Sequence, residues 1–251
     1  WQVHGGGFYH IQKYGIAPAN LPKDLIWFKW ESYATWLSGF ALMAIVYYGG
    51  ADLYLVDHEI AEISNHIAIA LSIGSLWIGW VLYNLLCKSK LGNNSTLLLL
   101  ILFCCLFFLS WFYTSIFSGR AAFLHLGAFT ATIMTANVFF IIIPNQKIVV
   151  ADLKGGRVPD PMYGVIAKQR STHNNYLTLP VIFFMLSNHY PLAFAAELNW
   201  AIAPLVFLLG VSIRHFFNTY HSQGRKLYWT WALSFLIFLI IIGLSAYRSP
   251  N

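Results

Sequence analysis

The chain has 251 residues, of which 58% are hydrophobic and 10% charged, and its formal net charge is +6. Soluble domains carry about 25% charged residues, so this composition excludes an ordinary soluble enzyme and indicates an integral membrane protein. The three cysteines show neither metal-ligand spacing nor a disulfide framework, and we interpret them as small packing residues.

Several apolar runs reach the roughly 20 residues that a helix needs to cross a bilayer. They predict seven spans, at residues 33–55, 63–87, 96–117, 121–143, 176–187 together with 191–196, 200–220 and 228–247. We therefore expect an all-α integral membrane protein, built as a bundle of seven transmembrane helices. Because the chain opens at Trp1 rather than at a methionine, we also expect one further span upstream, which would make eight.

The cations are concentrated in alternate loops between the predicted spans. One set of loops carries twelve of them: Lys13, Lys23, Lys29, Lys88, Lys90, Lys147, Lys154, Arg157, Lys168, Arg170, Arg225 and Lys226. The opposite loops carry Arg120 and Arg248 with the acids Asp52, Asp57, Glu59, Glu62 and Glu197. Cations collect on the cytoplasmic side of membrane proteins, so the C-terminus is expected outside. The surplus charge sets orientation in the lipid bilayer and does not indicate a nucleic-acid partner.

Two inner segments are candidates for function. Residues 1–30 form an expected inner-face loop with a Gly-rich motif, in which Gly5 to Gly7 lie between His4 and His10. Residues 31–251 then form a single membrane domain, the transmembrane helical bundle. Within it, residues 145–175 are predicted to be the longest inner loop, and loops of more than about 15 residues are usually functional or disordered.

The densest polar cluster lies at the end of that loop, directly before the apolar residues 181–186. It combines a guanidinium, amides and an imidazole, and Arg214 and His215 add a second cation and ring in the sixth span. Such a set suits a small planar anion. We expect catalytic roles for His173, Asn174, Asn175, Arg214 and His215, and substrate binding by His4, His10, Gln169, Arg170 and Thr172. The alternative is a juxtamembrane cluster that contacts lipid phosphates.

His66 and His125 lie about one turn inside the outer ends of two predicted spans. Two imidazoles at similar depth on different helices can ligate one haem iron from opposite faces, so we assign these two as metal ligands. The alternative is that each is an interhelical histidine held by hydrogen bonds. Spacing alone leaves both open.

Four stretches resemble the integral-membrane urate oxidase family over essentially the whole chain. They are His4-Gly-Gly-Gly-Phe-Tyr-His10, Trp27-Phe-Lys-Trp-Glu31 through Gly39, Asn137-Val-Phe-Phe with Ile143-Pro-Asn-Gln146, and Lys168-Gln-Arg-Ser-Thr-His-Asn-Asn-Tyr-Leu-Thr-Leu-Pro180 through Pro191. Many members of that family join a membrane domain of this kind to a C-terminal cytochrome c domain. Members also carry a span with its own histidine before the His-Gly-Gly-Gly stretch, which is the eighth span expected above.

The resemblance implies a membrane-bound oxidoreductase that converts urate to 5-hydroxyisourate. Electrons would pass through a haem to a cytochrome c, fused or separate, at the outer face of a bacterial-type inner (plasma) membrane. Urate would reach the His-Asn cluster from the cytoplasm. Two other functions stay open at this point: a non-catalytic or electron-relaying subunit of a respiratory oxidase or cytochrome complex, and a transporter of a planar anion.

Overall fold

The computed structural model describes residues 2–4, 6–10, 21 and 23–247. About 79% of the structure is helical, which confirms the all-α expectation. Two short strands, β1 (Gln2–His4) and β2 (Gly7–Tyr9), pair antiparallel, with His4 opposite Gly7. Gly6 sits in the turn with φ +80°, a backbone conformation that glycine adopts without steric cost. The Gly-rich motif therefore forms a β-hairpin.

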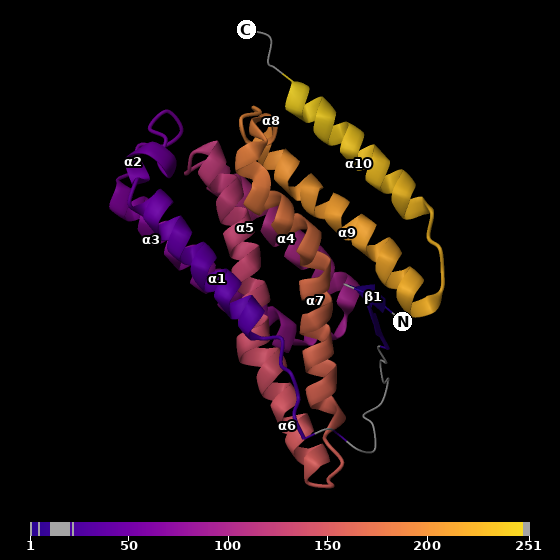
Figure 1. Cartoon of the computed structure of the whole chain (residues 1–251). Helices are drawn as coiled ribbons and strands as arrows, with labels where there is room; N and C mark the ends of the chain where they lie inside the picture. The colour runs from indigo at the N-terminus through magenta and orange to yellow at the C-terminus, as the bar shows by residue number, and fades with distance from the viewer. Residues whose placement is uncertain (1, 5, 11–20, 22, 248–251) are drawn as a thin grey trace.

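The helical elements follow one another with short connections (Figure 1). In chain order they are α1 (Trp30–Met43), the π-helix η1 (Ala44–Tyr48), α2 (Ala51–Tyr54), α3 (Asn65–Lys88), the 3₁₀ helix η2 (Lys90–Asn93), α4 (Ser95–Thr114), α5 (Gly119–Ala136), the π-helix η3 (Asn137–Ile142), α6 (Ile143–Lys154), α7 (Pro161–Leu186), the 3₁₀ helix η4 (Ser187–His189), α8 (Pro191–Phe194), α9 (Asn199–Gln223) and α10 (Trp229–Ala246).

Five helical segments in the described chain are long and apolar enough to cross a membrane. They are Asn65–Lys88, Thr96–Thr114, Gly119–Lys154, Asn199–Gln223 and Trp229–Ala246, which is consistent with a multi-pass membrane protein. The other two predicted spans do not reach that standard. The first is divided among α1, η1 and α2, and the fifth belongs to the polar helix α7. The structure therefore confirms a helical bundle, and the count of seven stays a prediction.

The prediction of a long loop at residues 145–175 was wrong, because α6 and most of α7 occupy it. Asp160 caps α7 by accepting a hydrogen bond from the Met162 amide (2.8 Å), and Pro161 stands in the first helical turn, where it needs no amide partner. Lys, Gln and Arg are good helix formers. Hydropathy marked this segment as a loop because it is polar, and many of its polar side chains, such as Lys147 and Lys168, are exposed on the helices.

The helix that includes α5, η3 and α6 is unusually long. At about 1.5 Å per residue, its 36 residues extend roughly 54 Å, well beyond a hydrocarbon core of about 30 Å. Figure 1 shows α6 and the start of α7 projecting below the other helices. Pro144 lies just after η3 and lacks the amide hydrogen that would bond to Phe140, so the local shift to π-helical bonding has a direct cause.

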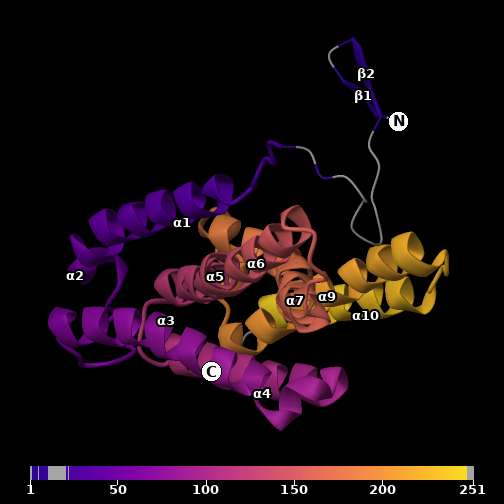
Figure 2. The same cartoon turned by 90° about the horizontal axis from the view of Figure 1, so that it is seen from below.

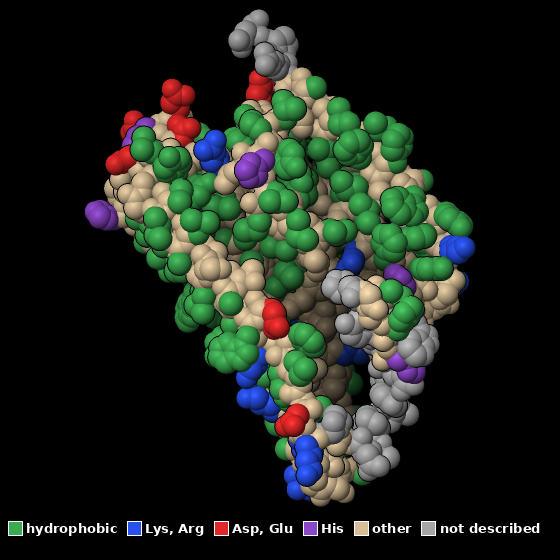
Figure 3. All heavy atoms as spheres, in the orientation of Figure 1, with side chains coloured by type: hydrophobic (Ala, Val, Ile, Leu, Met, Phe, Trp, Pro, Cys, Tyr) green, Lys and Arg blue, Asp and Glu red, His purple; other side chains and the backbone are tan. Residues whose placement is uncertain are grey.

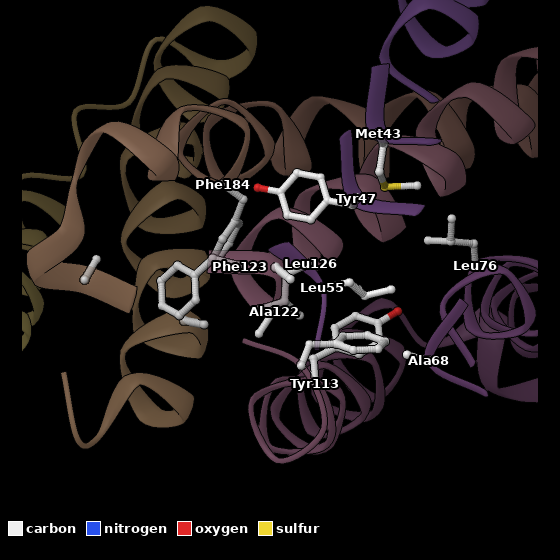
Figure 4. Close-up of a cluster of buried hydrophobic side chains, with 14 of the residues drawn as sticks. Met43, Tyr47, Leu55, Ala68, Leu76, Tyr113, Ala122, Phe123, Leu126 and Phe184 are labelled. Atoms are coloured by element: carbon white, nitrogen blue, oxygen red, sulfur yellow. The ribbon is translucent and has the colours of Figure 1, made fainter. Parts of the chain in front are cut away.

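Helix α7 lies in the middle of the bundle, packed on α5 and α9 (Figure 2). The main core is a cluster of aromatic and aliphatic side chains that includes Tyr47, Tyr113, Phe123 and Phe184 (Figure 4). Large apolar side chains also cover the outside, for example Trp77 (69% exposed) on α3 and Phe235 (63%) on α10. Figure 3 shows this apolar covering, which suits contact with lipid.

Acidic side chains gather near α2, and lysine and arginine gather near α6 at the opposite end (Figures 1 and 3). This separation agrees with the charge pattern of the sequence. The sidedness that we inferred from it remains a prediction.

Helices α7 and α9 pack closely at Pro180 and Gly210. A Cβ at Gly210 would lie 2.6 Å from Cδ of Pro180. Gly210→Ala is therefore expected to lower the free energy of unfolding by about 2 kcal/mol through overpacking. Gly243→Ala on α10 is the control, because nothing lies within 4 Å of its added Cβ. Thermal unfolding in detergent should show a lower Tm for the first variant alone; equal Tm values would contradict this packing.

Candidate functional site

Helix α7 presents its polar residues on two opposite faces. Successive residues of an α-helix are rotated by about 100°, so His173 and Asn175 point about 200° apart. Arg170, His173 and Asn174 face α3 and η3, whereas Asn175 faces α9. The predicted polar run therefore contributes to two separate clusters rather than to one.

The first cluster, here the α3–α7 cluster, consists of Tyr83, Asn84, Asn137, Arg170, His173 and Asn174. Arg170 is only 1% exposed, and its Nη2 donates to Oδ1 of Asn84 at 2.9 Å. Its guanidinium carbon also lies 5.0 Å from the centre of the Tyr83 ring, a cation–π contact. Within the described residues the ion pair is that of Arg157 with Asp152, so no carboxylate neutralises Arg170.

Hydrogen bonds in this cluster run in one direction. The Met134 carbonyl can only accept, so Nδ2 of Asn174 faces it (2.9 Å) and Oδ1 of Asn174 accepts from Nδ2 of Asn137 (3.0 Å). Nδ2 of Asn137 also donates to the hydroxyl oxygen of Tyr83 (3.0 Å). Because the Tyr83 oxygen accepts from Asn137, we assign the hydroxyl proton of Tyr83 to the 2.7 Å bond with Nδ1 of His173.

This order sets the tautomer of His173. Because Nδ1 accepts from Tyr83, a neutral ring carries its proton on Nε2. In the described part of the chain Nε2 has no hydrogen-bond partner, so its proton is available to another molecule. His173 is therefore arranged as a hydrogen-bond and proton donor.

The second cluster, here the α7–α9 cluster, consists of Asn175, Tyr176, Arg214, His215 and Asn218. Oδ1 of Asn175 accepts from Nε of Arg214 (3.0 Å) and from Nδ2 of Asn218 (2.8 Å). The Tyr176 hydroxyl is 2.9 Å from Nδ1 of His215, with the two rings stacked. Arg214 thus finds a side-chain acceptor on α7.

The remaining residues predicted to bind substrate lie outside these two clusters. Nε2 of Gln169 donates to the Gly92 carbonyl (2.9 Å) and so ties η2 to α7. Thr172 is exposed and bonds to the Lys168 carbonyl of its own helix. The side chain of His4 lies outside the described residues, and His10 is exposed after β2. Figure 2 shows the hairpin apart from the helices, not beside α7.

The two histidines expected to ligate haem do not fit a shared iron. His125 is fully buried, its Nδ1 is 2.7 Å from the Ala121 carbonyl and its Nε2 is 2.7 Å from Oγ of Ser72. Both ring nitrogens are thus occupied, and Tyr113 and Phe117 pack against the ring. His66 is exposed on α3, whose buried face carries Ser72. No group of three His, Cys, Asp or Glu in the described residues could hold a metal ion.

The partners of the predicted residues were missed by sequence reasoning. Tyr83, Asn84, Asn137 and Asn218 come from segments far from His173 in sequence, and all four complete the two clusters. An asparagine inside an apolar span was the available signal, because a buried amide needs hydrogen-bond partners. Asn137 is the clearest case, and the structure buries it fully.

An open cleft of about 540 Å³ lies at the end of the bundle that carries α2 and α8. Tyr54, Asp57, Arg120, Phe194 and Asn199 are among its lining residues, and none of the predicted site residues borders it. The cleft and the polar clusters of α7 are therefore separate features.

The chain matches the family model described as urate oxidase N-terminal over residues 1–245. The comparison with curated proteins and the comparison with solved structures each returned no match. The family match covers nearly the whole helical bundle, both polar faces of α7 included. The chain therefore belongs to the urate oxidase N-terminal family.

Proposed function

We propose that this protein is a membrane-embedded oxidoreductase that converts urate to 5-hydroxyisourate. Urate and one water yield 5-hydroxyisourate, two protons and two electrons. A cytochrome c, fused or separate, takes the electrons at the end of the bundle that carries α2 and α8. In this proposal that end faces outward from a bacterial-type inner membrane and the α6–α7 end faces the cytoplasm, in line with the charge pattern.

The observation that carries the proposal is the setting of His173. A neutral imidazole with a defined tautomer stands beside a buried guanidinium that no carboxylate neutralises. The cation suits an anionic substrate. When water adds to the oxidised purine, Nε2 can pass its proton to a ring nitrogen while Nδ1 takes the hydroxyl proton of Tyr83. The α7–α9 cluster, on the opposite face, holds α9 against α7 in this scheme.

A haem would supply one-electron transfer between substrate and cytochrome c. Because both ring nitrogens of His125 have hydrogen-bond partners, the pair of His66 and His125 does not fit such a group. The residues of the α3–α7 cluster act in binding and proton transfer only.

The test is urate-dependent reduction of cytochrome c by the purified chain in proteoliposomes, with oxygen removed. The expected result is two cytochromes reduced for each urate consumed, in step with formation of 5-hydroxyisourate. Radiolabelled urate that accumulates inside vesicles without being oxidised would instead identify a transporter. If urate is neither oxidised nor taken up, the proposal is contradicted and a subunit role remains.

A further inference from the structure

All the buried side-chain polar atoms that lack a hydrogen-bond partner in the described structure belong to one region. They are Nε1 of Trp80, Oδ1 of Asn137, and Nε and Nη1 of Arg170. Arg170 and Asn137 are part of the α3–α7 cluster, and Trp80 lies one helical turn before Tyr83 and Asn84 on the same face of α3. A buried polar group without a partner is costly, and a charged one more so.

Arg170 reaches from α7 to the side chains of Tyr83 and Asn84 on α3. The α3 and α7 backbones are not in close contact in the described structure, and Figures 1 and 2 show the two helices apart. Long side chains fill the space between them. The bond from Gln169 to the Gly92 carbonyl ties η2 to α7 at the residue next to Arg170.

The unpartnered atoms define the chemistry of the missing partner. They comprise three donor nitrogens, one amide oxygen acceptor and one uncompensated positive charge. A ligand that completes the set must be anionic, must offer acceptors to Trp80 and Arg170, and must present an N–H to Asn137. A simple inorganic anion lacks the N–H, and a neutral heterocycle lacks the charge.

We propose that Trp80, Asn137 and Arg170 form a recognition site for a planar heterocyclic anion that carries an N–H next to its acceptor edge. Nε and Nη1 of Arg170 donate to the anionic edge, Oδ1 of Asn137 accepts from the ring N–H, and Nε1 of Trp80 donates to a further acceptor. Naming urate as the ligand rests on the proposed function, whereas the ligand class follows from the four atoms.

Binding can be measured without turnover, by calorimetry on the full chain in nanodiscs with neither oxygen nor cytochrome c present. The probes are urate, nitrate as a small anion, and caffeine, which is neutral and has no N–H. Urate alone is expected to bind. Arg170→Met keeps a long, unbranched side chain without the guanidinium and should weaken urate binding by at least about 100-fold, because a buried charge contact is lost. Lys168→Met removes an exposed cation from the same helix and should leave the Kd unchanged.

Trp80→Phe provides a second variant that keeps an aromatic ring against Phe140 and removes only the N–H. It should weaken binding by about 10-fold. Equal Kd values for the wild type and both variants would overturn the site, as would nitrate binding as tightly as urate or no binding of urate to the wild type. If urate binds but cytochrome c is not reduced, the proposed oxidase function is rejected and the recognition site stands. If Arg170→Met still reduces cytochrome c with an unchanged KM for urate, the recognition site is rejected and the oxidase function stands.

Discussion

Replacing His173 with glutamine is expected to lower the rate of urate oxidation by about 10²–10⁴-fold, the usual contribution of a positioned acid or base. The Tyr83 hydroxyl donates to Nδ1 of His173 at 2.7 Å, and the proton on Nε2 is the one available for transfer. A glutamine amide can still accept from Tyr83 but has no titratable proton. The fold should therefore survive while kcat falls, as measured by cytochrome c reduction at saturating urate.

His221→Gln is the matched control, since His221 is an exposed imidazole near the end of α9. Its kcat should equal that of the wild type. If His173→Gln retained full kcat with an unchanged Tm, proton transfer would not pass through this ring, and the role given to the α3–α7 cluster would be rejected.

Asn175→Leu is expected to lower the free energy of unfolding by about 2 kcal/mol, because it leaves polar groups of α9 without their acceptor. Oδ1 of Asn175 accepts from both Arg214 and Asn218, at 3.0 and 2.8 Å. Leucine has a similar volume and no acceptor. Denaturant or thermal unfolding in detergent should show the loss, while the Kd for urate stays at the wild-type value.

Thr172→Val is the control for that experiment, since the Thr172 hydroxyl bonds only within its own helix. Its stability should change by less than about 0.5 kcal/mol, as is usual for exposed positions. If Asn175→Leu instead kept its Tm and lost urate binding, the substrate site would have to be assigned to the α7–α9 cluster.

Hydropathy predicted most of the bundle because a bilayer requires long apolar helices. The span predicted at residues 63–87 is α3 (Asn65–Lys88), and that at 228–247 is α10 (Trp229–Ala246). Hydropathy failed to predict the helices at residues 145–175, where α7 carries polar side chains on both sides. Apolar runs report exposure to lipid, and they do not reveal a helix whose polar groups bond to neighbouring helices.

The site was predictable in part. The sequence identified His173, Asn174 and Arg170 as residues whose polar groups need partners, and the family resemblance was confirmed by the match over residues 1–245. It could not show that Asn174 and Asn175 face different helices, because this depends on where α3, η3 and α9 pack. Nor could the sequence show that Ser72 forms a hydrogen bond with Nε2 of His125, because the two residues are 53 positions apart.

A structure of the protein determined with bound urate tests the placement of the substrate most directly. The account predicts ligand density between α3 and α7, in contact with Arg170, Asn137 and Trp80. Density beside Arg214 and His215 on the opposite face of α7, or no ligand density within the bundle, would contradict it.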